Sequence, residues 1–180
     1  MNNNARYHDL TIAMHWATAL FIVLAIGSVL LRDTVEDDDW QSFLLNLHRS
    51  MGVAILLLAI VRLLTRLIAS SSSVNAGLPK SVRLAAKAGH GVLYLFLLAL
   101  PLTGWLLTSA QGKTLSFFGV YDLPMLVSKN RDLADQLGGI HETGAWIFIA
   151  LIGMHISAAL WHHFWRKDQV LRSMLPDSSQ

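Results

Sequence analysis

The chain has 180 residues, of which 53% are hydrophobic and only 14% are charged, with a formal net charge of +2 at pH 7. The mean hydropathy of +0.46 is too high for an ordinary soluble domain and predicts an integral membrane protein. The chain contains no cysteine, which excludes disulfides, thiolate-bound iron–sulfur clusters and covalent haem attachment through a C-x-x-C-H motif.

Four apolar stretches predict transmembrane segments, because each is near or above the roughly 20 residues needed to cross a bilayer. The predicted spans are Leu10–Leu31, Leu44–Ile68, His90–Ala110 and Ile140–Trp165. Backbone polar groups must be paired within lipid, so the spans are expected to be helices. The predicted fold class is therefore all-α, with residues 1–180 forming a single membrane-embedded four-helix bundle.

Lysine and arginine residues are distributed unevenly between the two sides of these spans. If the N-terminus is inside, nine lie on the inner side and five on the outer side. The positive-inside rule then predicts that both termini are cytoplasmic. A cleaved signal peptide in place of the first span is disfavoured, because the apolar stretch is too long and no clear small-x-small cleavage site precedes Arg32.

Four histidines lie at two depths in the predicted spans. His15 and His155 lie at the inner depth, whereas His48 and His141 begin their spans at the outer side. His141 and His155 are 14 residues apart, which places them about 40° from alignment on one helix face and about 21 Å apart along its axis. One helix would thus present a histidine near each membrane face.

These depths predict two b-type haems, each held by two neutral imidazoles. His15 and His155 are the expected ligands of an inner haem. His48 and His141 are the expected ligands of an outer haem. Six-coordinate iron of this kind passes electrons and leaves no open position for O2, so electron transfer is the predicted function.

Small residues on or near the ligand face are compatible with a flat macrocycle against the backbone. They are Ala19, Gly52 and Gly144, each about one turn beyond a predicted ligand. Close helix packing is an equally good explanation, since membrane bundles use small residues for it. Pro101 is expected to kink the third span.

Arg62 lies 14 residues after His48 and therefore shares its helix face at the inner depth. A cation within an apolar helix usually has a buried partner, and the propionates of an inner haem are suitable partners. Extension of Arg62 to the inner surface beside Arg66 is the alternative, and the sequence does not choose between them. His90 is a third histidine at the inner depth and an alternative ligand, but His15 is preferred because it lies deeper in its apolar run, whereas His90 lies close to a cationic segment.

His162 follows His155 by seven residues and keeps nearly the same helix face. With His90 it is a candidate for binding and protonating a quinone, which requires hydrogen-bond donors to two carbonyl oxygens. The alternative is that both are ordinary interfacial polar residues, since aromatic residues flank His162. His8 and His163 are expected to be solvated.

Several short motifs together resemble the bacterial cytochrome b561 family over nearly the whole chain, with short termini similar to those of its free-standing four-helix members. The motifs are Met14-His15-Trp16, Leu47-His48, Val61-Arg62-Leu63-Leu64-Thr65-Arg66, Ala88-Gly89-His90, Tyr94 with Leu100-Pro101-Leu102-Thr103-Gly104, Ile140-His141-Glu142-Thr143, and Met154-His155 through His162-His163-Phe164-Trp165. The resemblance implies the same two ligand pairs for two haems b in a bacterial inner membrane. It also implies superoxide oxidase activity, in which superoxide is oxidised to O2 at the periplasmic face and ubiquinone is reduced at the inner haem.

The outer segments carry nine acidic residues, which is a departure from what an anionic donor requires. Arg49, Lys113, Lys129 or Arg131 would have to form a focused entry for superoxide. The expected partners are membrane lipid, ubiquinone and superoxide, with no nucleic acid.

Two other functions are compatible with the sequence. One is an electron conduit for a partner dehydrogenase, docked at the 28-residue outer connection from Gln111 to Gly138, which could instead cover the outer haem as a lid. The other is a haem-free transporter whose histidines bind a metal or relay protons. A transporter of this kind would be colourless.

Overall fold

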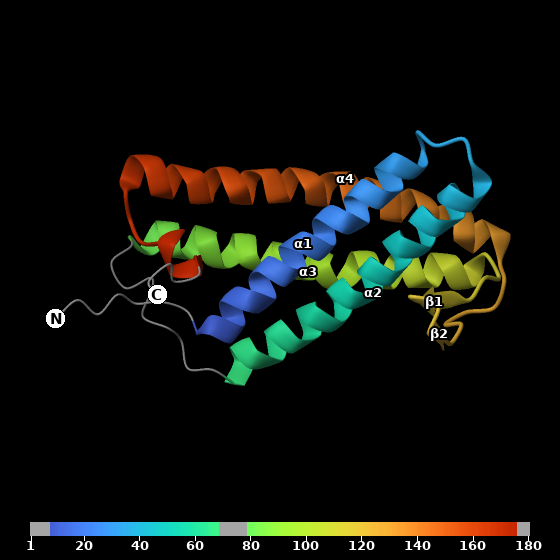
Figure 1. Cartoon of the computed structure of the whole chain (residues 1–180). Coiled ribbons are helices and arrows are strands. Elements are labelled where there is room, and N and C mark those ends of the chain that lie inside the picture. Colours follow the sequence, from blue (N-terminus) through green and yellow to red (C-terminus); the bar gives the residue numbers. More distant parts are fainter. Residues whose placement is uncertain (1–7, 69–78, 176–180) are drawn as a thin grey trace.

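The computed structural model describes residues 8–68 and 79–175. Four long helices dominate it, and each is long and apolar enough to cross a membrane. They are α1 (Asp9–Arg32), α2 (Asp38–Ile68), α3 (Lys80–Ala110) and α4 (Arg131–Trp161). Figure 1 shows α1 and α2 as one antiparallel pair that crosses the pair formed by α3 and α4. The chain is thus an all-α membrane four-helix bundle, as the sequence predicts.

Polar side chains at the helix N-termini explain why the helices begin before the apolar spans. The His8 side chain accepts a hydrogen bond from the Leu10 N–H at the start of α1. Asp37 accepts from the Trp40 N–H at 2.9 Å, and Asn130 accepts from the Leu133 N–H at 3.0 Å. Such caps satisfy backbone donors that have no partner within the helix, and each typically contributes about 1 kcal/mol.

The apolar core lies midway along the bundle. Its buried members are Ala25, Met51, Ile55, Ala59, Leu97 and Phe148. Phe148 stacks on Phe96 of α3 with ring centroids 5.8 Å apart. Phe148 is seven residues from both His141 and His155, so the core separates the two histidine levels along one face of α4.

The connection from α3 to α4 is shorter than the sequence predicts. It runs from Gln111 to Asn130, 20 residues, rather than to Gly138, because α4 begins with polar turns that a hydropathy pattern does not predict as helix. It contains an antiparallel hairpin formed by β1 (Leu115–Phe117) and β2 (Tyr121–Leu123). We call the end of the bundle that carries this hairpin the hairpin end, and the opposite end, where α1 begins and α4 ends, the terminal end (Figure 1).

The chain changes direction after α4. A π-helical turn, η2 (His162–Arg166), follows α4 directly, and Lys167 then adopts a left-handed conformation with φ +50°. A short 3₁₀-helix, η3 (Arg172–Met174), comes next. The fourth predicted span, which ends at residue 165, therefore includes a π-helical turn that apolar periodicity did not predict.

Candidate functional site

Four of the predicted histidines form two pairs across the helices. At the hairpin end, His48 of α2 faces His141 of α4 with ring centroids 6.0 Å apart. At the terminal end, His15 of α1 faces His155 of α4 with centroids 6.3 Å apart. His90 of α3 also contacts His155, with ring centroids 5.5 Å apart. The structure therefore brings together each predicted pair and adds a third imidazole at the terminal end.

These separations fit two imidazoles on opposite sides of one metal ion. An imidazole nitrogen lies about 2.0–2.1 Å from a bound transition metal and about 1.1 Å from its own ring centre, so the two centroids would be about 6.3 Å apart. The His48–His141 and His15–His155 separations agree with this value. The His90–His155 separation is shorter, which favours His15 over His90 as the partner of His155.

Hydrogen bonds fix the ring orientation at the hairpin end. The Nδ1–H of His48 donates to the Ala25 carbonyl oxygen at 2.8 Å, because a carbonyl can only accept. The Nδ1 of His141 lies 3.2 Å from Thr103 Oγ1, whose own proton goes to the Leu100 carbonyl, so His141 is the donor. Both rings thus leave Nε2 as the nitrogen with a free lone pair, as metal ligation at that atom requires.

His15 has a different partner. Arg62 donates from Nη2 to His15 Nδ1 at 3.3 Å and from Nη1 to Thr18 Oγ1 at 3.2 Å. Ligation of iron through His15 Nε2 would require the proton on Nδ1, and Arg62 would then have to donate to another acceptor. A propionate carboxylate is a suitable acceptor for a guanidinium, so Arg62 fits the predicted role at an inner haem.

Arg62 is held by neutral groups within the described residues. Besides His15 and Thr18, it lies over the Tyr94 ring at 5.7 Å, and Arg66 lies over the same ring at the same distance. Cation–π contacts of this kind contribute about 0.5–2 kcal/mol. The half-buried position of Arg62 against α1 and α3 differs from a simple extension to the surface, which describes Arg66 better.

The small residues near the histidines have different surroundings. Gly52 lines a cavity that both His48 and His141 also line, and an added Cβ there would meet no atom within 4 Å. Gly144, in contrast, packs against Leu100, where a Cβ would come within 3.0 Å of the side chain. Gly52 therefore fits the cofactor explanation, whereas Gly144 fits helix packing.

The hairpin covers the hairpin end of the bundle and is attached to α2. Ser50, which is only 1% exposed, accepts a hydrogen bond from the Phe118 N–H at 3.0 Å. Leu115 and Leu123 are buried against Val53 of α2. The hairpin is thus attached to α2, whereas Phe118, Tyr121 and Met125, three of the aromatic and apolar side chains on which the lid prediction depends, are exposed.

The remaining histidines lie at the terminal end or at its edge. His162 is largely shielded and binds Asp168 through Nδ1 at 2.5 Å. The expectation that His163 is solvated is wrong, because its Nδ1 is buried without a hydrogen-bond partner among the described residues and its ring packs on Phe164. His8 is exposed and caps α1.

Sequence reasoning missed two residues that contact His141 and a third that acts on the residue after His48. Gly104 lies against His141, where an added Cβ would come within 3.1 Å of the ring, and Thr103 accepts its proton. Both were noted only as part of a motif. Arg32 acts electrostatically on Arg49, next to His48, and its Nε is buried without a partner among the described residues. No sequence spacing indicates this pairing, because the two residues lie on different helices.

Comparison with known proteins identifies the family of this chain. The family profile described as "Prokaryotic cytochrome b561" matches residues 6–177. The chain is 34% identical to "Cytochrome b561 homolog 2" of Escherichia coli K12 over 180 residues, covering 99% of this chain and 95% of that protein. It is 33% identical to "Probable superoxide oxidase CybB" of Yersinia pestis over 171 residues (95% and 96%), and 33% identical to "Cytochrome b561 homolog 1" of E. coli K12 over 172 residues (95% and 97%).

The family match covers nearly the whole chain, including all four membrane helices and all the paired histidines. Family membership implies a b-type haem and a role in electron transfer, and the two imidazole pairs suit that group. The chain is therefore a multi-pass bacterial membrane cytochrome that belongs to the prokaryotic cytochrome b561 family.

Proposed function

We propose that this cytochrome carries two haems b and moves electrons from a donor at the periplasmic face to a quinone at the cytoplasmic face, with superoxide as donor and ubiquinone as acceptor. The observation that carries the proposal is the presence of two imidazole pairs, 6.0 and 6.3 Å between centroids, at two levels of α4. His48 and His141 would hold one haem, and His15 and His155 the other. Bound in this way, haem iron supplies reversible one-electron chemistry without an open coordination position.

The hairpin end is assigned to the periplasm and the terminal end to the cytoplasm. The uneven distribution of Lys and Arg in the sequence supports this orientation, since nine of the 14 fall in the segments that the sequence assigns to the inner side. An electron entering near His141 and leaving near His155 travels about 21 Å along α4. The apolar core around Phe148 lies between these levels and keeps water from joining them.

The donor side must attract an anion despite the acidic residues of the outer segments. Arg49 follows His48 directly, and Arg32 lies close enough to Arg49 to act on it electrostatically. Two neighbouring guanidiniums beside His48 provide the focused positive potential that steers superoxide. Arg32 is partly neutralised by Asp33, 3.6 Å away, so Arg49 contributes more of the attraction.

The acceptor side must bind a quinone and supply protons. His162 and His90 are the proposed quinone-binding residues, since both lie at the terminal end and His90 contacts His155. The His90 Nδ1–H donates to the Ala86 carbonyl at 2.7 Å, which directs Nε2 away from its own helix turn. Arg62 is the proposed partner of a haem propionate on this side.

An electron conduit for a partner dehydrogenase is the second candidate. The exposed part of the hairpin supports it, because Val120 is 87% and Tyr121 64% exposed beside the proposed donor site. A docked redox protein would cover these apolar side chains. A haem-free transporter is the remaining alternative and is tested by the same experiment.

The test is a visible spectrum of the purified, oxidised protein before and after a steady supply of superoxide, with haem quantified by extraction. We expect two haems per chain. We also expect superoxide to reduce the b-type bands rapidly and added ubiquinone to reoxidise them. Haem that stays oxidised under superoxide, yet is reduced by a redox protein, would favour the conduit. Protein without a Soret band would overturn both electron-transfer functions.

A further inference from the structure

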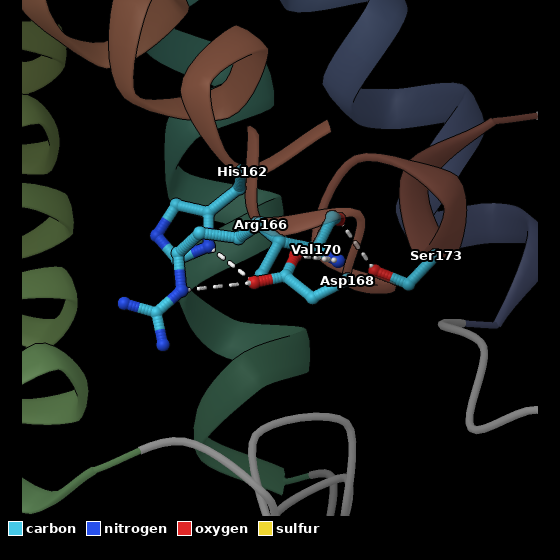
Figure 2. A network of polar contacts seen from close by, with 5 residues as sticks. All are labelled: His162, Arg166, Asp168, Val170 and Ser173. Atoms are coloured by element: carbon cyan, nitrogen blue, oxygen red, sulfur yellow. Dashed lines mark hydrogen bonds and ion pairs between the residues drawn. The ribbon is translucent and has the colours of Figure 1, made fainter. Parts of the chain in front are cut away.

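The chain that follows α4 brings a carboxylate back to His162. Because Lys167 is left-handed, the backbone reverses after η2, and the Lys167 and Asp168 N–H groups both donate to the His162 carbonyl. Asp168, six residues after His162, therefore lies beside its side chain, as Figure 2 shows. We call Lys167–Leu175 the C-terminal hook.

The His162–Asp168 pair is held in one geometry by several contacts. Asp168 Oδ2 lies 2.5 Å from His162 Nδ1 and 3.9 Å from Arg166 Nε. Its other oxygen, Oδ1, accepts from the Val170 N–H at 3.1 Å. The side chains of His162 and Asp168 are only 15% and 23% exposed. With both of its oxygens engaged, the carboxylate cannot rotate away from the imidazole without losing a hydrogen bond.

The charge state of Asp168 suits this contact. Burial acts to raise the pKa of its carboxyl, but hydrogen bonds from His162 and the Val170 N–H, together with the charges of His162 and Arg166, outweigh burial and lower the pKa. A carboxylate accepts but does not donate, so the Nδ1 of His162 carries a proton. The other ring nitrogen, Nε2, points away from Asp168, toward the side on which α3 runs in Figure 2.

The hook also reaches the helix that carries His15. The Ser173 hydroxyl donates to the Val170 carbonyl at 2.8 Å, and the Met174 carbonyl accepts from the Trp16 indole N–H at 2.8 Å. The Trp16 ring contacts His15 with centroids 5.5 Å apart. The position of Asp168 is thus tied to both helices that supply the terminal-end pair.

We propose that Asp168 is a positioning residue that fixes His162 as the proton donor for quinone reduction at the terminal end, an inference that rests on the proposed function. Two electrons, delivered one at a time, and two protons convert the quinone into a quinol, and each carbonyl oxygen becomes a hydroxyl. His162 gives the proton on Nε2 to a carbonyl oxygen and regains one from cytoplasmic water before the second transfer. Asp168 holds the Nδ1–H throughout and stabilises the imidazolium form.

The charged and titratable neighbours of the pair come from several elements. Within residues 8–68 and 79–175, Arg166 of η2 is the charged side chain that joins the pair. Helix α1 contributes the neutral Trp16 through the hook, and α3 contributes His90 at the same end. Asp168 therefore supplies the negative charge in contact with the His162 ring.

The experiment uses the full-length haem-loaded protein in nanodiscs, reduced in advance and mixed with a short-chain ubiquinone at pH 7. Asp168→Asn should slow haem reoxidation by about 10- to 100-fold. Asp168→Glu should restore most of the rate. His162→Gln should be equally slow, and the double variant no slower than either single one, because the two residues act as a unit. Glu36→Gln, which removes one exposed negative charge at the hairpin end, is the matched control.

A wild-type rate in Asp168→Asn would overturn the inference. So would a loss of rate without rescue by Glu, which indicates a merely structural role. An independent readout is the imidazole NMR signal of His162 in the reduced, diamagnetic protein, assigned by its loss in His162→Gln. The Nδ1–H proton signal should move upfield in Asp168→Asn, because its charged acceptor is lost. Wild-type protein that superoxide reduces but ubiquinone does not reoxidise would refute the proposed function instead, and the Nδ1–H signal would still report whether Asp168 holds His162.

Discussion

Replacing Gly52 with alanine tests whether a planar group lies against α2 between His48 and His141. In the protein alone the new methyl group meets no atom within 4 Å. Alanine is also favoured over glycine within a helix by about 0.8–1.0 kcal/mol. Packing and helix propensity therefore predict that Gly52→Ala leaves the fold as stable as before or slightly more stable.

If His48 and His141 hold a haem, the same substitution is expected to weaken haem binding. Gly52 is one turn from His48 and lines the cavity between His48 and His141, so the added methyl group would press on the porphyrin ring. Forcing an extra methyl into a filled site costs about 1–3 kcal/mol, which corresponds to about a 5- to 150-fold weaker affinity for that haem. The terminal-end haem should be unaffected, because its ligands lie about 21 Å away along α4.

The assay is the haem-to-protein ratio from pyridine haemochrome spectra, combined with a redox titration that separates the two haems and a thermal melt. Gly27→Ala is the matched control, because its added Cβ also meets no atom within 4 Å and Gly27 does not line the cavity. We expect one haem to become substoichiometric in Gly52→Ala and none in Gly27→Ala. Two full-occupancy haems with unshifted potentials in Gly52→Ala would refute the reasoning.

Four further perturbations have expected outcomes. His141→Ala should remove one haem and retain the other, as judged by extraction; loss of both from a folded variant would contradict separate sites. Arg62→Gln should lower the midpoint potential of one haem by tens of millivolts, since a nearby positive charge favours the electron-rich state, and an unchanged titration would place Arg62 away from that haem. Ser50→Ala leaves the Phe118 N–H without its buried acceptor, at a cost of about 1–3 kcal/mol, and should expose the hairpin to limited proteolysis. The folded pKa of Asp168 is lowered, so its stabilisation is complete above pH 3.8, the ordinary value, and is lost as the pH falls through the lowered value. Asp168→Asn should therefore lower the Tm at pH 7, and its difference from the wild type should shrink as the pH is lowered below 3.8; a difference that does not change with pH would contradict the linkage.

The parts of the fold set by hydrophobicity and helical periodicity were predictable. Four apolar runs gave four membrane helices, and the 14-residue spacing of His141 and His155 correctly indicated two levels on one face. The pairing of His48 with His141 followed from depth alone, because both lie toward the start of helices, α2 and α4, that run in the same direction. Depth within the apolar run also favoured His15 over His90, and although both rings contact His155, the His15–His155 separation fits a shared metal ion better.

The parts that depend on backbone irregularity or on contacts between distant segments were not predictable. The position of Asp168 beside His162 requires a π-helical turn and a left-handed Lys167, which no periodicity signals. The attachment of the hairpin to α2 through Ser50 joins residues 68 apart in the chain. The polar first turns of α2 and α4 were also not predictable, because a hydropathy pattern does not detect the side-chain caps that begin these helices.

The arrangement of the imidazole pairs has a consequence for assembly in the membrane. The helices pack mainly as two hairpins, α1 with α2 and α3 with α4, and both imidazole pairs join one hairpin to the other. Each hairpin can insert into the bilayer independently, whereas each bound haem would stabilise only the docked bundle. At a free ligand concentration 100 times the Kd, each site adds about 2.7 kcal/mol to docking, or about 5 kcal/mol for two. Haem supply would then regulate how many chains reach the docked state, and chains made under haem limitation would be the first removed by membrane proteases.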